Sequence, residues 1–229
     1  MTAAKQTIKT AFIEALPLAI AIATYGLSYG VLAAQAELGI AVIVLMSILV
    51  FSGSVQMVVV AMLTVGASLT SILLTTVLLN LRNLLYGAAL AESILPAKKW
   101  RWLLAYGVTD EPFVLGIARF KKYGPDPLYF GVITATFYLA WVLSGLMGTL
   151  IGNQVDPQKW GLDLAFPLTF IALLLPGLKT NPAIATAFAA AAIGIGLEYL
   201  MPGNELTIIA AGVLAPLVGL YVRGRSKDA

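Results

Sequence analysis

Three charged residues stand out because they interrupt apolar segments. Arg82 follows a run, Leu38–Leu81, that carries no charged side chain. Asp110 and Glu111 stand side by side, directly before Pro112, in the middle of another apolar segment. An arginine at the centre of a membrane span costs about 2.5 to 3.5 kcal/mol, so it normally has a partner, a cavity or a substrate. An arginine also offers a permanently charged, bidentate group for a carboxylate.

The same residues have a structural interpretation. Arg82 would then form an ion pair with Asp110 or Glu111, as buried charges in membranes often do. Asp110 would cap a helix that runs from Glu111 onward, since Asp before Glu-Pro is a typical helix start. A helix start inside a membrane protein is itself a feature that binds ions, so this interpretation does not exclude function. The sequence leaves both interpretations open.

Neutral polar residues lie close to these charges in the sequence. Gly and Ser interrupt the apolar run at Phe51–Gln56. The interruption predicts either a broken helix, whose free N–H groups face an anionic group, or a small-residue surface for helix packing. The candidate substrate-binding residues are Arg82, Asn80, Asn83, Gln56, Ser52, Gly53 and Ser54, and the candidates for proton coupling or ammonium binding are Asp110 and Glu111.

The composition places these residues in a membrane protein. The 229 residues are 60% hydrophobic and 11% charged, with a mean hydropathy of +0.92, against about 45 to 50% apolar and about 25% charged in soluble domains. We expect an all-α fold, a polytopic membrane helix bundle of seven or eight spans, some of them broken or re-entrant, in a single integral membrane domain, 1–229.

Two residue types are missing, which limits the chemistry. The sequence has no Cys and no His, so thiol catalysis, Ser-His chemistry and His-ligated metals are excluded, and a proton relay would have to use carboxylates. We predict no cofactor and no metal, and an intramembrane enzyme is disfavoured. The net charge of +3 reflects cytoplasmic flanks and does not indicate a nucleic-acid partner.

The predicted spans begin close to the N-terminus. Lys5 and Lys9 precede the apolar segment 11–34, which is longer than the core of a signal peptide, about 7 to 15 residues. We therefore predict an uncleaved first span and a cytoplasmic N-terminus. The other predicted features are a turn at Gly66–Ser68, spans at 69–90, 128–152, 164–178, 182–201 and 206–222, and a cytoplasmic C-terminal tail.

Two basic clusters give conflicting side assignments. Arg119–Lys122 fits the cytoplasm, but three crossings from a cytoplasmic N-terminus would leave Lys98–Arg101 outside. Either the block 38–97 makes an extra, re-entrant pass, or this cluster breaks the positive-inside rule and 102–118 is a true span. The sequence does not decide between these alternatives.

An internal repeat would follow from the second alternative, because it gives eight spans. Tyr25–Gly30 loosely resembles Trp141–Gly145. A four-plus-four repeat would place these two copies in the same orientation.

Several ordered motifs together resemble one known family. They are Pro17 with Tyr25-Gly26 and Gly30, Met46-Ser47, Phe51-Ser52-Gly53-Ser54-Val55-Gln56, Asn80-Leu81-Arg82-Asn83-Leu84-Leu85-Tyr86-Gly87 and Thr109-Asp110-Glu111. In order and spacing they resemble the AzlC-type branched-chain amino acid permeases, the azaleucine-resistance family, over most of the chain and most strongly from 11 to 120. One departure is Asn83, where the family commonly has a histidine after the arginine.

The resemblance implies export of branched-chain amino acids such as valine or leucine across the bacterial inner membrane. It also implies a small, separately encoded membrane partner of the AzlD type. We expect a secondary transporter coupled to the proton gradient, and the alternative is a channel-like or structural membrane subunit that needs a partner. In a transporter, Arg82 would bind the substrate carboxylate, and Asp110 or Glu111 would bind the ammonium or carry a proton.

Overall fold

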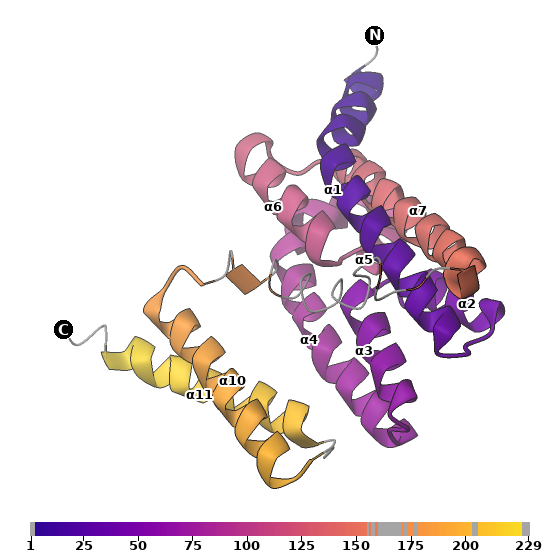
Figure 1. Cartoon of the computed structure of the whole chain (residues 1–229). Helices are drawn as coiled ribbons and strands as arrows, with labels where there is room; N and C mark the ends of the chain where they lie inside the picture. The colour runs from indigo at the N-terminus through magenta and orange to yellow at the C-terminus, as the bar shows by residue number, and fades with distance from the viewer. Residues whose placement is uncertain are drawn as a thin grey trace. The chain divides into compact units, whose positions relative to one another are not determined.

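The computed structural model is helical, as expected (Figure 1). It describes residues 3–154, 156, 159, 171, 174–175, 178–202 and 206–225. The chain divides into two compact units. Unit 1 comprises Met1–Leu63 and Leu79–Phe166, and unit 2 comprises Thr64–Leu78 and Pro167–Ala229.

The helices match most of the predicted spans. Those up to residue 154 are α1 (Ala3–Gln35), α2 (Ile40–Leu49), α3 (Gly53–Thr64), α4 (Leu69–Ile94), the 3-10 helix η1 (Leu95–Trp100), α5 (Arg101–Tyr106), α6 (Asp110–Tyr123), α7 (Pro127–Ile151) and the 3-10 helix η2 (Gly152–Gln154). Among the described residues, α1, the run from α4 to α5, α7, and α10 (Asn181–Leu200) are long and apolar enough to cross a membrane. A membrane helix bundle is therefore confirmed. Most of the predicted span 164–178 lies outside the described residues.

Unit 1 is built on α1 and α7, which lie side by side (Figure 1). Glycines let their backbones touch: a Cβ added to Gly30 would lie 2.6 Å from the Thr149 nitrogen, and one added to Gly148 would lie 3.1 Å from the Gly30 Cα. The segments Tyr25–Gly30 and Trp141–Gly145, which resemble each other in sequence, meet at this crossing. The internal repeat itself stays a prediction.

Hydrogen bonds at both ends show that α1 and α7 run in the same direction. At one end, Tyr129 Oη donates to Glu14 Oε2 at 2.6 Å. At the other, Gln35 Nε2 donates to the Gly152 carbonyl at 3.0 Å. We name these end A, marked by Glu14 and Tyr129, and end B, marked by Gln35 and Gly152.

The helices α2 and α3 form a re-entrant pair that starts from end B. Tyr29, close to the end-B end of α1, donates from its hydroxyl to the Ile43 carbonyl, and Tyr138, in the middle of α7, donates to the Ile48 carbonyl, each at 3.3 Å. Because Ile43 precedes Ile48, α2 runs from end B toward the middle of α7. The chain breaks there at Phe51, whose φ is 43°. The broken-helix prediction at Phe51–Gln56 is thus confirmed.

The part of α4 that belongs to unit 1, from Leu79 onward, leads from α3 to end A. The first turn of α3 lies against the middle of α4, where Ser54 binds Arg82. From there α4 leads to Ala97 and Trp100, which line a groove with Pro127 and Leu128 at end A. Within unit 1, α4 therefore runs from the level of Arg82 toward end A.

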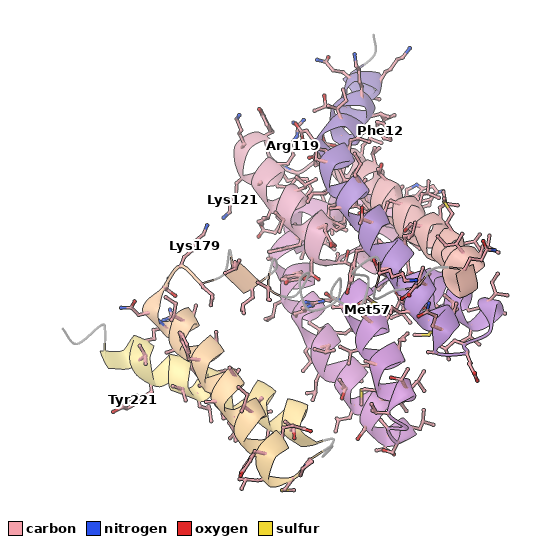
Figure 2. All side chains as sticks on the ribbon, in the orientation of Figure 1. Phe12, Met57, Arg119, Lys121, Lys179 and Tyr221 are labelled. Carbon is pink, nitrogen blue, oxygen red and sulfur yellow. The ribbon has the colours of Figure 1, made fainter. Side chains whose placement is uncertain are left out.

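The helices α5 and α6 form a second re-entrant pair, from end A. Going inward along α5, Leu104 approaches Gly131, and Gly107 would clash with Thr134 if it carried a Cβ. Going back along α6, the Phe120 ring lies 6.2 Å from the Phe130 ring. Figure 2 shows Arg119 between α6 and α1, where its Nη1 lies 3.8 Å from Glu14 Oε1. Both ends of this pair therefore lie at end A.

The two re-entrant pairs remove the conflict between the basic clusters. Lys98–Arg101 and Arg119–Lys122 lie at end A, where α1 also begins with Lys5 and Lys9. The block 38–97 makes the extra pass, as the first alternative proposed. The segment 102–118 is not a single span, because α5 ends at Tyr106 and α6 returns.

Unit 2 contains a helical hairpin of α10 and α11 (Leu206–Arg225), which lie side by side (Figure 1). Thr180 caps α10 by accepting a hydrogen bond from the Ala183 nitrogen at 3.4 Å. Gly219 on α11 approaches the start of α10, since an added Cβ would lie 2.9 Å from the Pro182 carbonyl oxygen. The helices are therefore antiparallel.

Single-cysteine labelling tests the two re-entrant pairs, because the chain has no cysteine of its own. We expect Lys5→Cys, Lys99→Cys and Lys121→Cys to react with a membrane-impermeant maleimide from one side of oriented vesicles. Val65→Cys, in the exposed turn between α3 and α4, should react only from the other side. Labelling of Lys99→Cys and Val65→Cys from the same side would contradict the crossing of α4, and labelling of Lys99→Cys and Lys121→Cys from opposite sides would contradict the return of α6.

Candidate functional site

The centre of unit 1 holds an ion pair between Arg82 and Asp110. Arg82 Nη2 lies 2.9 Å from Asp110 Oδ2, and the two side chains are 30% and 22% exposed. The same Nη2 donates a hydrogen bond to Ser54 Oγ. Arg82 is near the middle of α4, so the ion-pair interpretation from the sequence is confirmed, with Asp110 as the partner.

Two aromatic residues fix the orientation of Asp110. Tyr86 lies one helical turn after Arg82 and donates from its hydroxyl to Asp110 Oδ1 at 3.0 Å. The Tyr86 ring stacks on Phe113, with centroids 4.2 Å apart and an interplanar angle of 13°. Both Asp110 oxygens are therefore engaged, one by Arg82 and one by Tyr86.

The ion pair joins the starts of two helices. Ser54 is in the first turn of α3, and Asp110 is the first residue of α6. The prediction that Asp110 caps α6 is wrong, because extended Thr109 is the cap residue and the Asp110 side chain faces Arg82. Each helix start has backbone N–H groups without helical partners and a partial positive charge. The arrangement therefore favours an anionic group.

Gln56 connects the break between α2 and α3 to α7. Its Oε1 accepts from the Ser52 nitrogen at 3.3 Å and from Trp141 Nε1 at 3.1 Å, and its Nε2 donates to Ser47 Oγ at 3.3 Å. The residue is 0% exposed. Because its amide is engaged on both sides, Gln56 positions the start of α3.

Aromatic rings cover the start of α3. The Trp141 ring lies 5.4 Å from Tyr29 and 5.5 Å from Tyr25, measured between centroids. A Cβ on Gly53 would lie 2.9 Å from the Tyr25 ring and 3.1 Å from the Trp141 ring. Gly53 therefore lets the two rings approach the backbone next to Ser54, and these rings provide apolar surface beside the ion pair.

Two buried hydrogen-bond donors in this region have no partner. They are Arg82 Nε and the Tyr25 hydroxyl. The Tyr25 ring lies against Gly53, the residue before Ser54. Buried polar groups are normally hydrogen-bonded, so each of these two donors has the capacity to bind one further acceptor.

The remaining candidates differ in how they relate to Arg82. Glu111 follows Asp110 at the start of α6 and makes no ion pair among the described residues. Asn83 Nδ2 donates to Asn80 Oδ1 at 3.1 Å across one turn of α4. Asn83 also lines a groove between α4 and α5. Among the described residues, no hydrogen bond joins the side chains of this asparagine pair to Arg82 or Asp110.

Sequence reasoning gave no role to Tyr25, Tyr86 or Trp141, although all three contact the site. Only Tyr86 had a usable signal, because its position four residues after Arg82 places both on one helix face. Within the described ranges, no group of three His, Cys, Asp or Glu side chains could hold a metal ion.

The comparisons with known proteins identify a family. The model of the family described as "AzlC protein" matches residues 17–155. This range includes α2 to α7, and thus every residue of the ion-pair site. No solved structure matches the chain.

Curated relatives align over nearly the whole chain. An "Uncharacterized membrane protein" of Helicobacter pylori is 26% identical over 95% of this chain and 96% of its own length. "Branched-chain amino acid transport protein AzlC" of Bacillus subtilis is 24% identical over 88% of this chain and 80% of its own length. "Inner membrane protein YgaZ" of Escherichia coli is 25% identical over 94% and 91%.

Replacement of Gln56 tests its positioning role. Gln56→Leu leaves the Ser52 and Trp141 donors without their acceptor, and a buried unpaired group costs about 1 to 3 kcal/mol. We expect the melting temperature in detergent, followed by tryptophan fluorescence, to fall by about 4 to 8 °C. Gln6→Leu, at an exposed position of α1, is the control, and equal melting temperatures for the two variants would rule out this role.

Proposed function

Because the chain belongs to the AzlC family, we propose that it is a secondary transporter that exports branched-chain amino acids across a bacterial inner membrane. The observation that carries the proposal is the Arg82–Asp110 pair, located where two helices begin in the middle of unit 1. A charged group inside a membrane is energetically costly, so its presence there points to a functional role. The name of the Bacillus subtilis relative supports the substrate class.

In this proposal, the substrate carboxylate binds to Arg82 on the side that Asp110 leaves free. Asp110 and Ser54 occupy Nη2, whereas Nε is buried and unpaired. Nε and the Tyr25 hydroxyl would donate to the carboxylate, and the starts of α3 and α6 would add their partial positive charge. Asp110 then acts as a positioning residue, which holds the guanidinium in place.

Glu111 is the group that we assign to the substrate ammonium and to the proton. Unlike Asp110, it has no ion-pair partner among the described residues, and it directly follows Asp110 in the first turn of α6. If the ammonium and a proton compete for this carboxylate, uptake of one releases the other. Competition of this kind would couple export to the proton gradient.

The branched side chain would lie against the aromatic rings. Tyr25 and Trp141 border Gly53, and Phe113 stacks on Tyr86 beside Asp110. These rings offer apolar contact without a further charged partner. The observed polar groups are therefore sufficient for the backbone part of a zwitterion, and the aromatic surface suits an aliphatic side chain.

The proposal also includes sidedness and a partner. End A would face the cytoplasm, because Lys5, Lys9 and both basic clusters lie there. The N-terminus would then be cytoplasmic, and we propose the same for the C-terminal tail on the basis of its basic residues. A small AzlD-type subunit is proposed from the family resemblance.

Replacement of Arg82 tests the carboxylate site. We expect Arg82→Lys and Arg82→Gln to reduce leucine counterflow in proteoliposomes about 10- to 100-fold, since a hydrogen bond to a charged group contributes about 1.5 to 3 kcal/mol. Tyr25→Phe should weaken the apparent affinity for leucine without changing the fold. Arg119→Lys, at the other end of α6, is the control, and wild-type counterflow in correctly inserted Arg82→Lys would disprove the carboxylate assignment.

Replacement of Glu111 tests the coupling. In the wild type, raising the pH deprotonates Glu111, so the apparent affinity for leucine should increase with pH. Glu111→Gln should bind leucine more weakly and show no such pH dependence. Glu92→Gln, at an exposed position of α4, should behave like the wild type. Retention of the wild-type pH dependence by Glu111→Gln would exclude this residue as the coupling group.

A further inference from the structure

A basic and aromatic turn lies at end A, where α4 passes into α5. It contains Lys98, Lys99 and Arg101, all exposed, and the exposed rings of Trp100 and Trp102. The cations lie over the rings: Lys99 Nζ is 5.9 Å from the Trp100 centroid, and Arg101 Cζ is 5.2 Å from the Trp102 centroid. Glu92 is the sole acidic residue in the sequence between Leu69 and Thr109, so the turn is strongly cationic.

Two apolar grooves begin at this turn, one on each side of α5. The first, about 680 Å³, lies between α4 and α5, and its wall includes Gly87, Ala105, Arg101 and Trp102. The second, about 470 Å³, lies between α5 and α7, and its wall includes Trp100, Leu104 and Leu128. The same basic turn therefore contributes to the mouth of both grooves.

The first groove follows α4 from η1 toward the middle of that helix. Its other wall is α5, which has six residues and ends at Tyr106. Along α4 the first groove extends from Asn83 to Leu95, about 18 Å at a helical rise of about 1.5 Å per residue. One leaflet of a hydrocarbon core about 30 Å thick is about 15 Å deep. The groove therefore has about the depth of one leaflet.

We propose that this place binds one anionic phospholipid, whose phosphate lies at Lys98, Lys99 and Arg101 and whose two acyl chains occupy the two grooves. Exposed tryptophans at the headgroup level and clustered cations beside them are typical of contact with anionic lipids. The single basic turn fits the single charged headgroup of a phospholipid, and the two apolar grooves fit its two acyl chains. The site is separate from the Arg82 ion pair and does not depend on the proposed transport function.

Native mass spectrometry of the full chain, released from nanodiscs of phosphatidylglycerol or phosphatidylcholine, tests the proposal. We expect the wild type to retain a phosphatidylglycerol molecule, with at least about tenfold preference over phosphatidylcholine. The triple variant Lys98→Gln, Lys99→Gln, Arg101→Gln should lose this preference. The matched control removes three other cations at end A, as Lys9→Gln, Lys121→Gln, Lys122→Gln, and should keep it. Figure 2 shows Lys121 projecting outward from α6.

A second variant tests the grooves without changing any charge. A Cβ on Gly87 meets nothing within 4 Å, so Gly87→Leu should fill the first groove without a clash and lower the retained phosphatidylglycerol about tenfold. Gly196→Leu, on α10, has the same open surroundings and should retain lipid like the wild type. The proposal is overturned if the two triple variants retain phosphatidylglycerol equally, or if Gly87→Leu retains as much as Gly196→Leu.

Discussion

A positive charge held in an apolar interior is the constraint on which unit 1 depends. Arg82 lies in the middle of α4, far from either end of that helix. It is accommodated because Asp110 neutralises it and Ser54 accepts a hydrogen bond from it. Both partners lie in the first turn of a helix that begins inside the unit, so the two helix breaks and the ion pair require one another. Without the Asp110 carboxylate, two positive helix starts would face a guanidinium.

The close crossing of α1 and α7 positions this pair from a distance. Gly30 and Gly148 bring the two backbones together, which brings Trp141 over Tyr25 and Tyr29. Trp141 then donates to Gln56, and Gln56 accepts from the backbone where α3 begins. The start of α3 in turn presents Ser54 to Arg82. The glycine contact between α1 and α7 thus positions Trp141, which with Gln56 holds Ser54 beside Arg82.

The sequence predicts the parts of this arrangement that depend on local composition. The uncharged run before Arg82 indicates a membrane, and Asp-Glu-Pro predicts a helix start within one residue of the true one. The Gly and Ser residues at 52–54 predict either a broken helix or a small-residue packing surface, and the structure shows the break. The return of α6 could not be predicted, because hydropathy is the same for a span and for two short helices. Likewise, composition does not tell which polar groups pair: Asn80 and Asn83 bind each other, and Tyr86 binds Asp110.

The two ends of α6 are fixed by different kinds of contact. Its first residue is held by the ion pair with Arg82 on α4, inside the unit. Its last turns are held at end A, where Arg119 lies 3.8 Å from Glu14 and over the Tyr129 ring. The second contact is longer, and Glu14 is exposed, so water and salt weaken it more than they weaken the first. The end of α6 at end A is therefore held more weakly than the end that carries Asp110.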